Sequence, residues 1–521
     1  MPQPGDPFRF RGLARDVPAV VWVITATFGV LLVLHTALTP LYRAPDEARH
    51  IDQVLALREG RGYPPPGKEI LSQEVLGSYR AAGYATEGPN GIGVPDPRTD
   101  IRTPLPLTRE GAPDLAGAPA YKDVPALKRP LSQLNQMTQH PPLYYALGAA
   151  VLWVIPSDQD LPFPWVIGIL RLLSVACLVP LPLLAFQTAR RLGLPQAAAA
   201  AAVPLAIPQL AHIGSAVTND SLLIGLFSLL TVALTFVATG DLSKRTAVYV
   251  GLLAAAALFT KAFALAILPW IVVAYAVALW RTRSRLAVGG AIIAGATSVL
   301  GGWWYVVNVL RYGSVQSEQT VQRNYKLAPE GFTPSVSAYV DEFASKVSTR
   351  FWGEFGYLEV PLPSGFTTPA SWVLLALLVL GAVALRPRLP GLALLVPLAG
   401  VAAIMVVGTY GLYSKYAVFP GLQGRYLFPA LAGASVLVAC GLRQLTRLAA
   451  PVVALVLALG CQLYGDQVEL DKVWGGSLRT VASWSWYPGW IVYAAVVAIV
   501  LLAGSALALM ARDLLVREAP A

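Results

Sequence analysis

Long apolar stretches separated by short polar segments form the main pattern of the sequence. A helix needs about twenty apolar residues to cross a bilayer, and about twelve stretches approach or exceed that length. They are Val17–Leu38, Pro164–Ala189, Gln196–Ala216, Ser221–Thr239, Thr246–Thr260, Ala262–Trp280, Leu286–Leu310, Pro369–Leu385, Leu392–Tyr413, Tyr426–Leu442, Pro451–Tyr464 and Tyr487–Met510. The pattern predicts an all-α polytopic membrane protein with a bundle of about twelve transmembrane helices.

One further apolar segment, Pro141–Ile155, is short and begins with two prolines. If it does not cross the membrane, the basic residues between the long stretches all fall on one side, which the positive-inside rule identifies as the cytoplasm. If it crosses, every later basic loop lies outside while the N-terminus stays inside. We therefore predict a juxtamembrane helix at 141–155 and a multi-pass protein of the plasma membrane whose N- and C-termini are cytoplasmic.

Two large loops then face the outer side, at residues 39–163 and 311–368. The first is expected to carry short amphipathic helices near Asp46–Gly60 and Leu131–Ile155, joined by an irregular segment rich in Pro and Gly. Neither loop is large enough to bury a core of its own. Residues 1–521 are therefore expected to form a single integral membrane domain with juxtamembrane helices in a large first outer loop.

Composition supports this assignment. Of the 521 residues, 55% are hydrophobic and 13% charged, whereas soluble domains carry about a quarter charged residues. The net charge of +10 comes mostly from short loops, so it reflects membrane topology and argues against a nucleic-acid partner. The three cysteines lie in apolar stretches and indicate neither a disulfide frame nor a zinc site. The first apolar stretch is read as an uncleaved anchor.

An acidic pair, Asp46-Glu47, follows directly on the first apolar stretch. Two carboxylates at a membrane surface could hold a metal, accept a proton, or simply mark a helix start opposite its dipole. Adjacent residues point to different sides of a helix, so the two side chains are expected to have different roles.

Basic residues recur on the same predicted side as the acidic pair. Arg171, Lys261, Arg311 and Arg425 are placed at or just below the outer face. Arg171 could instead snorkel to the surface, and Lys261 could be an interfacial anchor. Together these cations would suit a lipid phosphate, and a nearby carboxylate would supply a general base for an acceptor hydroxyl.

Other polar and aromatic residues are candidates for contacts with an acceptor or a sugar, each with a structural alternative. They are His50, His140, Tyr144, Asn219, Asp220 and Trp352. The alternatives are helix-start and headgroup chemistry for the segment after His140, helix capping for Asn219 and Asp220, and lipid contact for Trp352. The sequence has no Walker signature, glycine-rich strand–helix loop, nucleophile elbow or HExxH motif, which disfavours a nucleotide-driven reaction.

These motifs resemble the GT-C superfamily of integral membrane glycosyltransferases, which includes protein O-mannosyltransferases and lipid A aminoarabinose transferases. They look most like a bacterial branch of predicted membrane proteins known mainly as a domain of unknown function. The motifs that carry the resemblance are Pro45-Asp46-Glu47, Pro141-Pro142-Leu143-Tyr144-Tyr145, Asn219-Asp220-Ser221, Phe351-Trp352-Gly353 and Gly424-Arg425-Tyr426. Each is short, so the specificity lies in their order.

The resemblance implies a GT-C-like fold, a polyprenyl-phosphate sugar donor, and transfer on the outer face with inversion. It implies that Asp46 is the base, that Glu47 supports it, and that Lys261 and Arg425 bind the donor phosphate. The acceptor would be an envelope glycan, lipid or protein. Some superfamily members use a divalent metal with a second acidic motif; Asp220, Asp341, Glu342 and Glu354 are candidates, and the metal requirement stays open.

Two other function classes remain. A transporter or flippase of a lipid-linked or anionic solute would favour internal repeats and charges near the bilayer midplane, and the sequence shows no repeat of fixed period. A non-catalytic scaffold of an envelope assembly would tolerate loss of the acidic pair.

Overall fold

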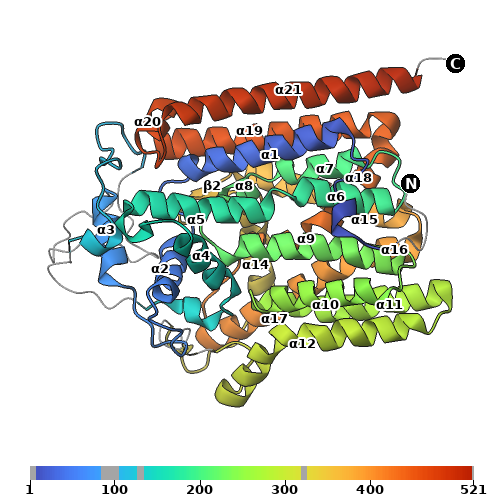
Figure 1. Ribbon diagram of the computed structural model, residues 1–521, viewed down its shortest axis with the longest axis horizontal. Coiled ribbons are helices and arrows are strands. Elements are labelled where there is room, and N and C mark those ends of the chain that lie inside the picture. Colours follow the sequence, from blue (N-terminus) through green and yellow to red (C-terminus); the bar gives the residue numbers. More distant parts are fainter. Residues whose placement is uncertain (1–6, 84–104, 126–133, 318, 320–324, 519–521) are drawn as a thin grey trace.

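The computed structural model describes residues 7–83, 105–125, 134–317, 319 and 325–518. Long helices run side by side along its longest axis (Figure 1). The helices of this bundle are α1 (Ala19–Leu38), α5 (Phe163–Leu178), α6 (Leu181–Arg191), α7 (Ala198–Ala202), α8 (Pro208–Gly214), α9 (Asn219–Ala238), α10 (Lys244–Leu258), α11 (Ile267–Thr282), α12 (Leu286–Tyr312), α15 (Ser364–Ala384), α16 (Arg388–Leu392), α17 (Leu395–Tyr416), α18 (Leu431–Thr446), α19 (Ala450–Trp474) and α21 (Trp490–Glu518).

Shorter elements cover one end of the bundle. They are α2 (Glu47–Arg58), α3 (Gln73–Ala81), α4 (Leu143–Trp153), α14 (Val336–Trp352), α20 (Leu478–Ser483) and the strands β1 (Glu354–Phe355) and β2 (Val360–Pro361). The strands form a small antiparallel hairpin in which Phe355 pairs with Val360. Short 3₁₀ segments complete the chain: η1 (Phe10–Gly12), η2 (Tyr121–Asp123), η3 (Gln136–Gln139), η4 (Asp158–Asp160), η5 (Val203–Ala206), η6 (Ala262–Ala266), η7 (Gly424–Ala430) and η8 (Arg447–Ala449).

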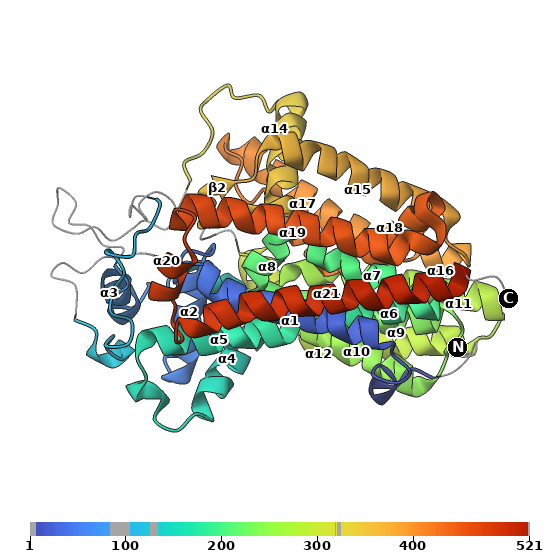
Figure 2. The same ribbon diagram turned by 90° about the horizontal axis from the view of Figure 1, so that it is seen from above.

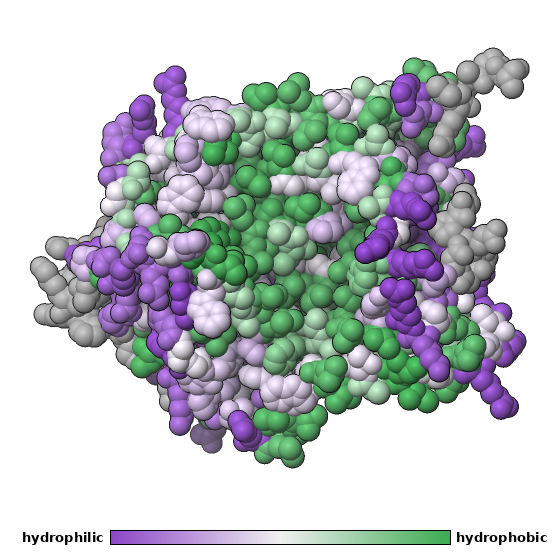
Figure 3. Space-filling view, in the orientation of Figure 1, coloured by the Kyte–Doolittle hydropathy of each residue, from purple (hydrophilic) through white to green (hydrophobic). Residues whose placement is uncertain are grey.

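The surface confirms an all-α polytopic membrane fold. Nine stretches of the described residues are long and apolar enough to span a membrane, and one of them, Gly424–Trp474, contains both α18 and α19. Hydrophobic side chains form a broad central belt between two hydrophilic ends (Figure 3). All the apolar stretches expected from the sequence contain helix, and α10, with 15 residues, is shorter than a usual crossing.

The stretch Gln196–Ala216 differs from the straight crossing that we predicted. It is broken into α7, η5 and α8. Pro204 lies in η5, and Pro208 is the first residue of α8. Proline lacks an N–H donor and clashes with the preceding turn, so an α-helix cannot run unbroken through these two positions. The segment lies inside the bundle, where α19 packs against η5 and α7.

Helices α2, α3 and α4 of the first loop lie at the end of the bundle opposite both termini (Figures 1 and 2). Helix α2 forms where the sequence predicts it, and α4, with 11 residues, is only about 16 Å long. That length is too short to cross a membrane, as we expected for 141–155. Helix α3 falls within the segment expected to be irregular; its N-cap Ser72 accepts a hydrogen bond from the Val75 backbone N–H. Much of that segment, 84–104 and 126–133, lies outside the described residues.

Segments from distant parts of the sequence meet at this end of the molecule. Helix α2 packs on α4, α9 contacts both α4 and η7, and α14 packs on η7. The hairpin β1–β2 lies between α8 and α19. This convergence brings the acidic pair, the turn before η6, and the start of η7 together.

Candidate active site

Asp46 lies where the chain enters α2, with a backbone φ of 63°. Asp is among the residues that tolerate this left-handed conformation. Three donors contact one carboxylate oxygen, Oδ1: the Tyr357 hydroxyl at 3.0 Å, the Gln136 amide at 3.1 Å and the Arg49 guanidinium at 3.2 Å. The other oxygen, Oδ2, faces Arg425 at 3.9 Å. The carboxylate is therefore fixed through Oδ1, while Oδ2 keeps capacity for a further hydrogen bond.

The surroundings of Asp46 keep it ionised. Burial alone would raise its pKa, but the positive charges of Arg49 and Arg425 outweigh burial and hold the pKa of Asp46 below its usual value. The hydrogen bond from Tyr357 acts in the same direction. The side chain is 22% exposed, so the carboxylate is accessible. An ionised, accessible and oriented carboxylate can accept a proton.

Two cations and a second carboxylate lie beside Asp46. The Lys261 ammonium donates to Asp220 Oδ1 at 2.5 Å, and Arg425 Nε lies 3.4 Å from Asp220 Oδ2. Both cations also lie over the Tyr426 ring, at 5.0 and 5.6 Å from its centroid. These charged side chains are almost fully buried. Neither Arg425 Nε nor Asp220 Oδ2 has a hydrogen-bond partner among the described residues, so Arg425 retains a donor for an anion.

Glu47 has very different surroundings from Asp46. It is fully buried and makes a two-pronged ion pair with Arg171, with N···O distances of 2.8 and 2.7 Å. Its Oε1 also accepts a hydrogen bond from the Val217 backbone N–H at 3.0 Å. The carboxylate thereby ties α2 to α5 and to the segment before α9.

Arg171 is fully buried as well, and its remaining donors are engaged. They contact the backbone carbonyls of Thr36, Thr39 and Pro40 at 2.6 to 3.0 Å. A guanidinium has five N–H donors, and here all five have acceptors. The helix α1 ends at these carbonyls, so the arginine caps that end. The arrangement differs from the predicted phosphate ligand because no donor remains for an anion.

Neutral polar side chains border the charged group. The Tyr145 hydroxyl forms hydrogen bonds with two of them, His50 through Nδ1 at 3.1 Å and Asn219 through Nδ2 at 3.5 Å. Burial, with the charge of Lys261 nearby, lowers the pKa of both His50 and His140 to about 3. Both imidazoles are therefore neutral at physiological pH. Asn219 Oδ1 and His140 Nδ1 are buried without a hydrogen-bond partner among the described residues, which leaves them available to a ligand.

Three other candidates make no hydrogen bond or ion pair with Asp46. Tyr144 is buried and hydrogen-bonds Ser174 at 2.8 Å. Trp352 donates to Ser371 at 2.9 Å and packs between α14 and α15. Arg311 is exposed in the last turn of α12. Trp352, predicted to contact a sugar, therefore packs between two helices instead.

The candidate metal ligands are dispersed. Asp341 is exposed on α14, Glu342 pairs with Lys346 on the same helix at 2.6 Å, and Glu354 pairs with an arginine one turn before it. Asp220 is occupied by cations. Within the described ranges no group of three His, Cys, Asp or Glu side chains is arranged to hold a metal ion.

Sequence reasoning missed two residues that contact Asp46. Gln136 lies in η3, and Tyr357 lies in the turn of the hairpin β1–β2. Tyr357 is 311 positions from Asp46 in the sequence, and its surroundings carry no pattern that points to a carboxylate.

Comparison with known proteins gives distant structural likenesses and one family match. The chain is similar to the crystal structure of ArnT from Cupriavidus metallidurans bound to undecaprenyl phosphate, at 13% identity and a TM-score of 0.44, over 94% of this chain and 78% of that one. It is also similar to the Archaeoglobus fulgidus oligosaccharyltransferase in its apo form, at 12% identity and a TM-score of 0.43, over 91% and 57% of the two chains.

No curated protein matches the sequence. The family described as predicted membrane protein DUF2142 matches residues 28–434. This span is most of the chain, and it contains Asp46, Asp220, Lys261 and Arg425. The match agrees with the resemblance to a branch of predicted membrane proteins. The chain therefore belongs to the DUF2142 family of predicted membrane proteins.

Proposed function

We propose that this protein is a membrane glycosyltransferase that moves a sugar from a polyprenyl-phosphate carrier to an acceptor of the cell envelope. The observation that carries the proposal is the state of Asp46: ionised, accessible, fixed through Oδ1, and within 3.9 Å of a cation that is not fully hydrogen-bonded. A general base beside an anion site is the arrangement that glycosyl transfer from a phosphate requires.

In the proposed reaction, Asp46 Oδ2 takes the proton of the acceptor hydroxyl. The acceptor oxygen then forms a bond to the anomeric carbon of the sugar, on the face opposite the leaving group, while the bond from that carbon to the phosphate oxygen breaks. The electron pair of the broken bond stays on the phosphate, and the transfer inverts the anomeric centre. Lys261 and Arg425 stabilise the charge that develops on the leaving phosphate.

The other candidate residues have supporting roles in this proposal. His50, His140 and Asn219 contact the sugar or the acceptor through their neutral polar atoms. Asp220 keeps the two cations in place before the donor binds. Glu47 acts on the reaction only through its ion pair with Arg171, which fixes the start of α2.

The reaction is proposed to occur on the outer face of the plasma membrane. Helix α2, which begins directly after Asp46, lies at the end of the bundle opposite the two termini (Figure 1). The basic loops of the sequence favour a cytoplasmic location for the termini. A lipid-linked donor supplies the activated sugar on the face where nucleotide sugars are not available.

The test is sugar transfer in membranes supplied with polyprenyl-phosphate sugars, with wild type compared with Asp46→Asn at equal expression. Transfer is expected to fall by at least about a hundredfold, the usual contribution of a general base, while binding of undecaprenyl phosphate is retained. Asp123→Asn, an exposed carboxylate of the same loop, is the matched control. Unchanged transfer in Asp46→Asn would remove Asp46 from the mechanism. A wild type that moves lipid-linked sugar across the bilayer without transferring it would establish a flippase.

A further inference from the structure

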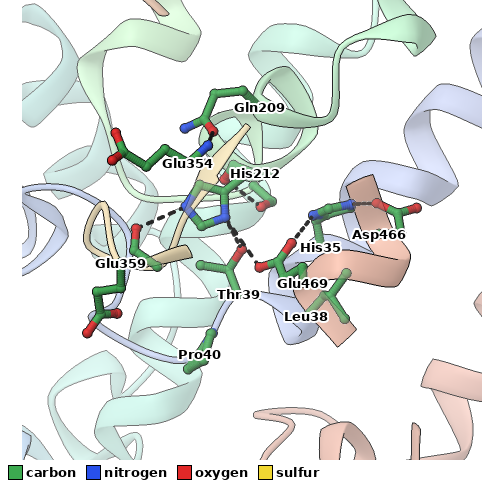
Figure 4. Close-up of polar contacts among 12 residues, drawn as sticks. His35, Leu38, Thr39, Pro40, Gln209, His212, Glu354, Glu359, Asp466 and Glu469 are labelled. Atoms are coloured by element: carbon green, nitrogen blue, oxygen red, sulfur yellow. Dashed lines mark hydrogen bonds and ion pairs between the residues drawn. The ribbon is translucent and has the colours of Figure 1, made fainter. Parts of the chain in front are cut away.

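A second polar cluster is formed by the buried side chains of His35, His212 and Glu469 together with the partly buried Asp466 (Figure 4). Glu469, on α19, is fully buried between two imidazoles: Oε1 is 3.5 Å from His212 Nδ1, and Oε2 is 3.7 Å from His35 Nδ1. His35 Nε2 contacts Asp466 Oδ1 at 3.0 Å. None of these residues touches Asp46, so the proposed reaction does not use them directly.

His212 connects this cluster to the hairpin β1–β2. Its Nε2 lies 3.3 Å from the backbone carbonyl oxygen of Gly356. A carbonyl oxygen only accepts hydrogen bonds, so Nε2 carries the proton and donates. On the other side of the ring, Nδ1 faces the Thr39 hydroxyl at 3.0 Å and Glu469. The Phe355 ring packs edge-on against the imidazole at 5.6 Å. The ring is thus fixed on both sides.

The residue after Gly356 is Tyr357, which donates to Asp46 Oδ1. Gly356 has a φ of 63°, a left-handed conformation that glycine adopts without strain, so the hairpin turn favours glycine at this position. Gln209 holds the start of the hairpin by accepting a hydrogen bond from the Glu354 backbone N–H at 2.6 Å. Gln209 and His212 both belong to α8, which therefore presents two contacts to the hairpin.

We propose that His212, held by Thr39 and the Phe355 ring, is a positioning residue that holds the hairpin β1–β2 so that Tyr357 donates to Asp46. The inference rests on the proposed role of Asp46 as the base. It assigns a purpose to a buried histidine that has no place in the proposed reaction. Tyr357 acts directly on Asp46, and His212 acts only through Tyr357.

The test measures protonation of the Asp46 carboxyl without any sugar donor. Carbodiimide couples an amine only to a protonated carboxyl, so the pH of half-maximal labelling of Asp46 reports its protonation. The purified full chain in lipid nanodiscs is labelled over the acidic range, and the Asp46 peptide is quantified by mass spectrometry. Wild type is compared with Tyr357→Phe, His212→Asn, His212→Gln and the double variant of Tyr357→Phe with His212→Asn.

Tyr357→Phe removes a hydrogen bond to the carboxylate, so the half-labelling pH is expected to rise by about one unit. His212→Asn keeps a polar group near Nδ1 but loses the donor to Gly356, and is expected to shift labelling in the same direction. His212→Gln places its amide near Nε2 and is expected to behave as wild type. Because His212 acts through Tyr357, the double variant should shift no further than Tyr357→Phe alone.

Three results would overturn the proposal: wild-type labelling in His212→Asn, wild-type labelling in Tyr357→Phe, or a double variant whose shift equals the sum of the single shifts. Thr246→Val, which removes a hydrogen bond to Asp241 at the far end of α10, controls for general loss of stability and should not shift labelling. If His212→Asn does not fold, Gln209→Met loosens the same hairpin and must shift labelling upward. Absence of sugar transfer in wild type would refute the proposed function. The labelling experiment could still be interpreted, because it uses no sugar donor.

Discussion

Replacing each of the adjacent carboxylates Asp46 and Glu47 by its amide should destabilise the fold to very different extents. Glu47→Gln keeps the shape of the side chain but removes its charge, and it leaves the guanidinium of Arg171 buried without a counter-ion. The side chains of Arg171 and Glu47 are both 0% exposed. Breaking a buried ion pair from one side costs about 3–5 kcal/mol, because an uncompensated charge remains. Asp46→Asn keeps acceptors for its donors in a partly exposed site and should cost about 1 kcal/mol.

The assay is thermal unfolding of the purified protein in detergent, followed by size-exclusion chromatography, with wild type and both variants prepared in parallel. Glu47→Gln is expected to unfold at a clearly lower temperature, and Asp46→Asn close to wild type. Equal midpoints for the two variants would refute the structural assignment of Glu47. Arg171→Met combined with Glu47→Leu should recover only part of the loss, since three backbone carbonyls at the end of α1 lose their donors, at about 1–3 kcal/mol for each buried group.

Two further predictions concern the anion site and the packing of the bundle. Lys261→Met should weaken binding of undecaprenyl phosphate to the protein in nanodiscs by about tenfold, or about 1.4 kcal/mol, and Lys261→Arg should retain most of it; unchanged binding in Lys261→Met would remove this residue from the phosphate site. Gly381→Ala should destabilise the fold by about 1–3 kcal/mol in thermal unfolding, because a Cβ there would lie 1.8 Å from the Leu437 backbone oxygen. Gly504→Ala, with open space around Gly504, should not destabilise it. Equal unfolding midpoints for these two variants would contradict the close contact of α15 and α18.

Hydrophobic length located the helices because crossing a bilayer is a local requirement on the chain. A run of apolar residues shows where a helix lies whatever its neighbours are. The same signal failed at Gln196–Ala216, where Pro204 and Pro208 interrupt the helix while the residues stay apolar. It also failed at α3, whose helical pattern is short and lies among prolines and glycines. Finding such interruptions and short helices requires the chemistry of individual residues, such as proline and N-cap serine, in addition to the length of the apolar stretch.

The site was predictable only where one residue carried the signal alone. Asp46 follows the first apolar stretch, Lys261 is the lone charge of its turn, and Arg425 lies on the predicted outer side against the positive-inside tendency. Tyr357 reaches Asp46 from a distant hairpin, and Trp352 turns into a helix interface. Contacts of this kind depend on the tertiary arrangement, which no spacing in the sequence encodes.

A single physical rule separates the structural charges from the candidate functional ones at this end of the bundle. A buried charge must be compensated by partners. The charges of Arg171 and Glu47 are fully compensated: every N–H donor of the guanidinium has an acceptor, and no donor remains for a ligand. For Arg425 and Asp220 the compensation is incomplete, since their facing atoms lie 3.4 Å apart without a hydrogen bond. Position in the sequence put Arg171 and Arg425 in one class, and only the state of their hydrogen bonds divides them. A charge that is buried but incompletely bonded is therefore the better guide to where a substrate phosphate binds.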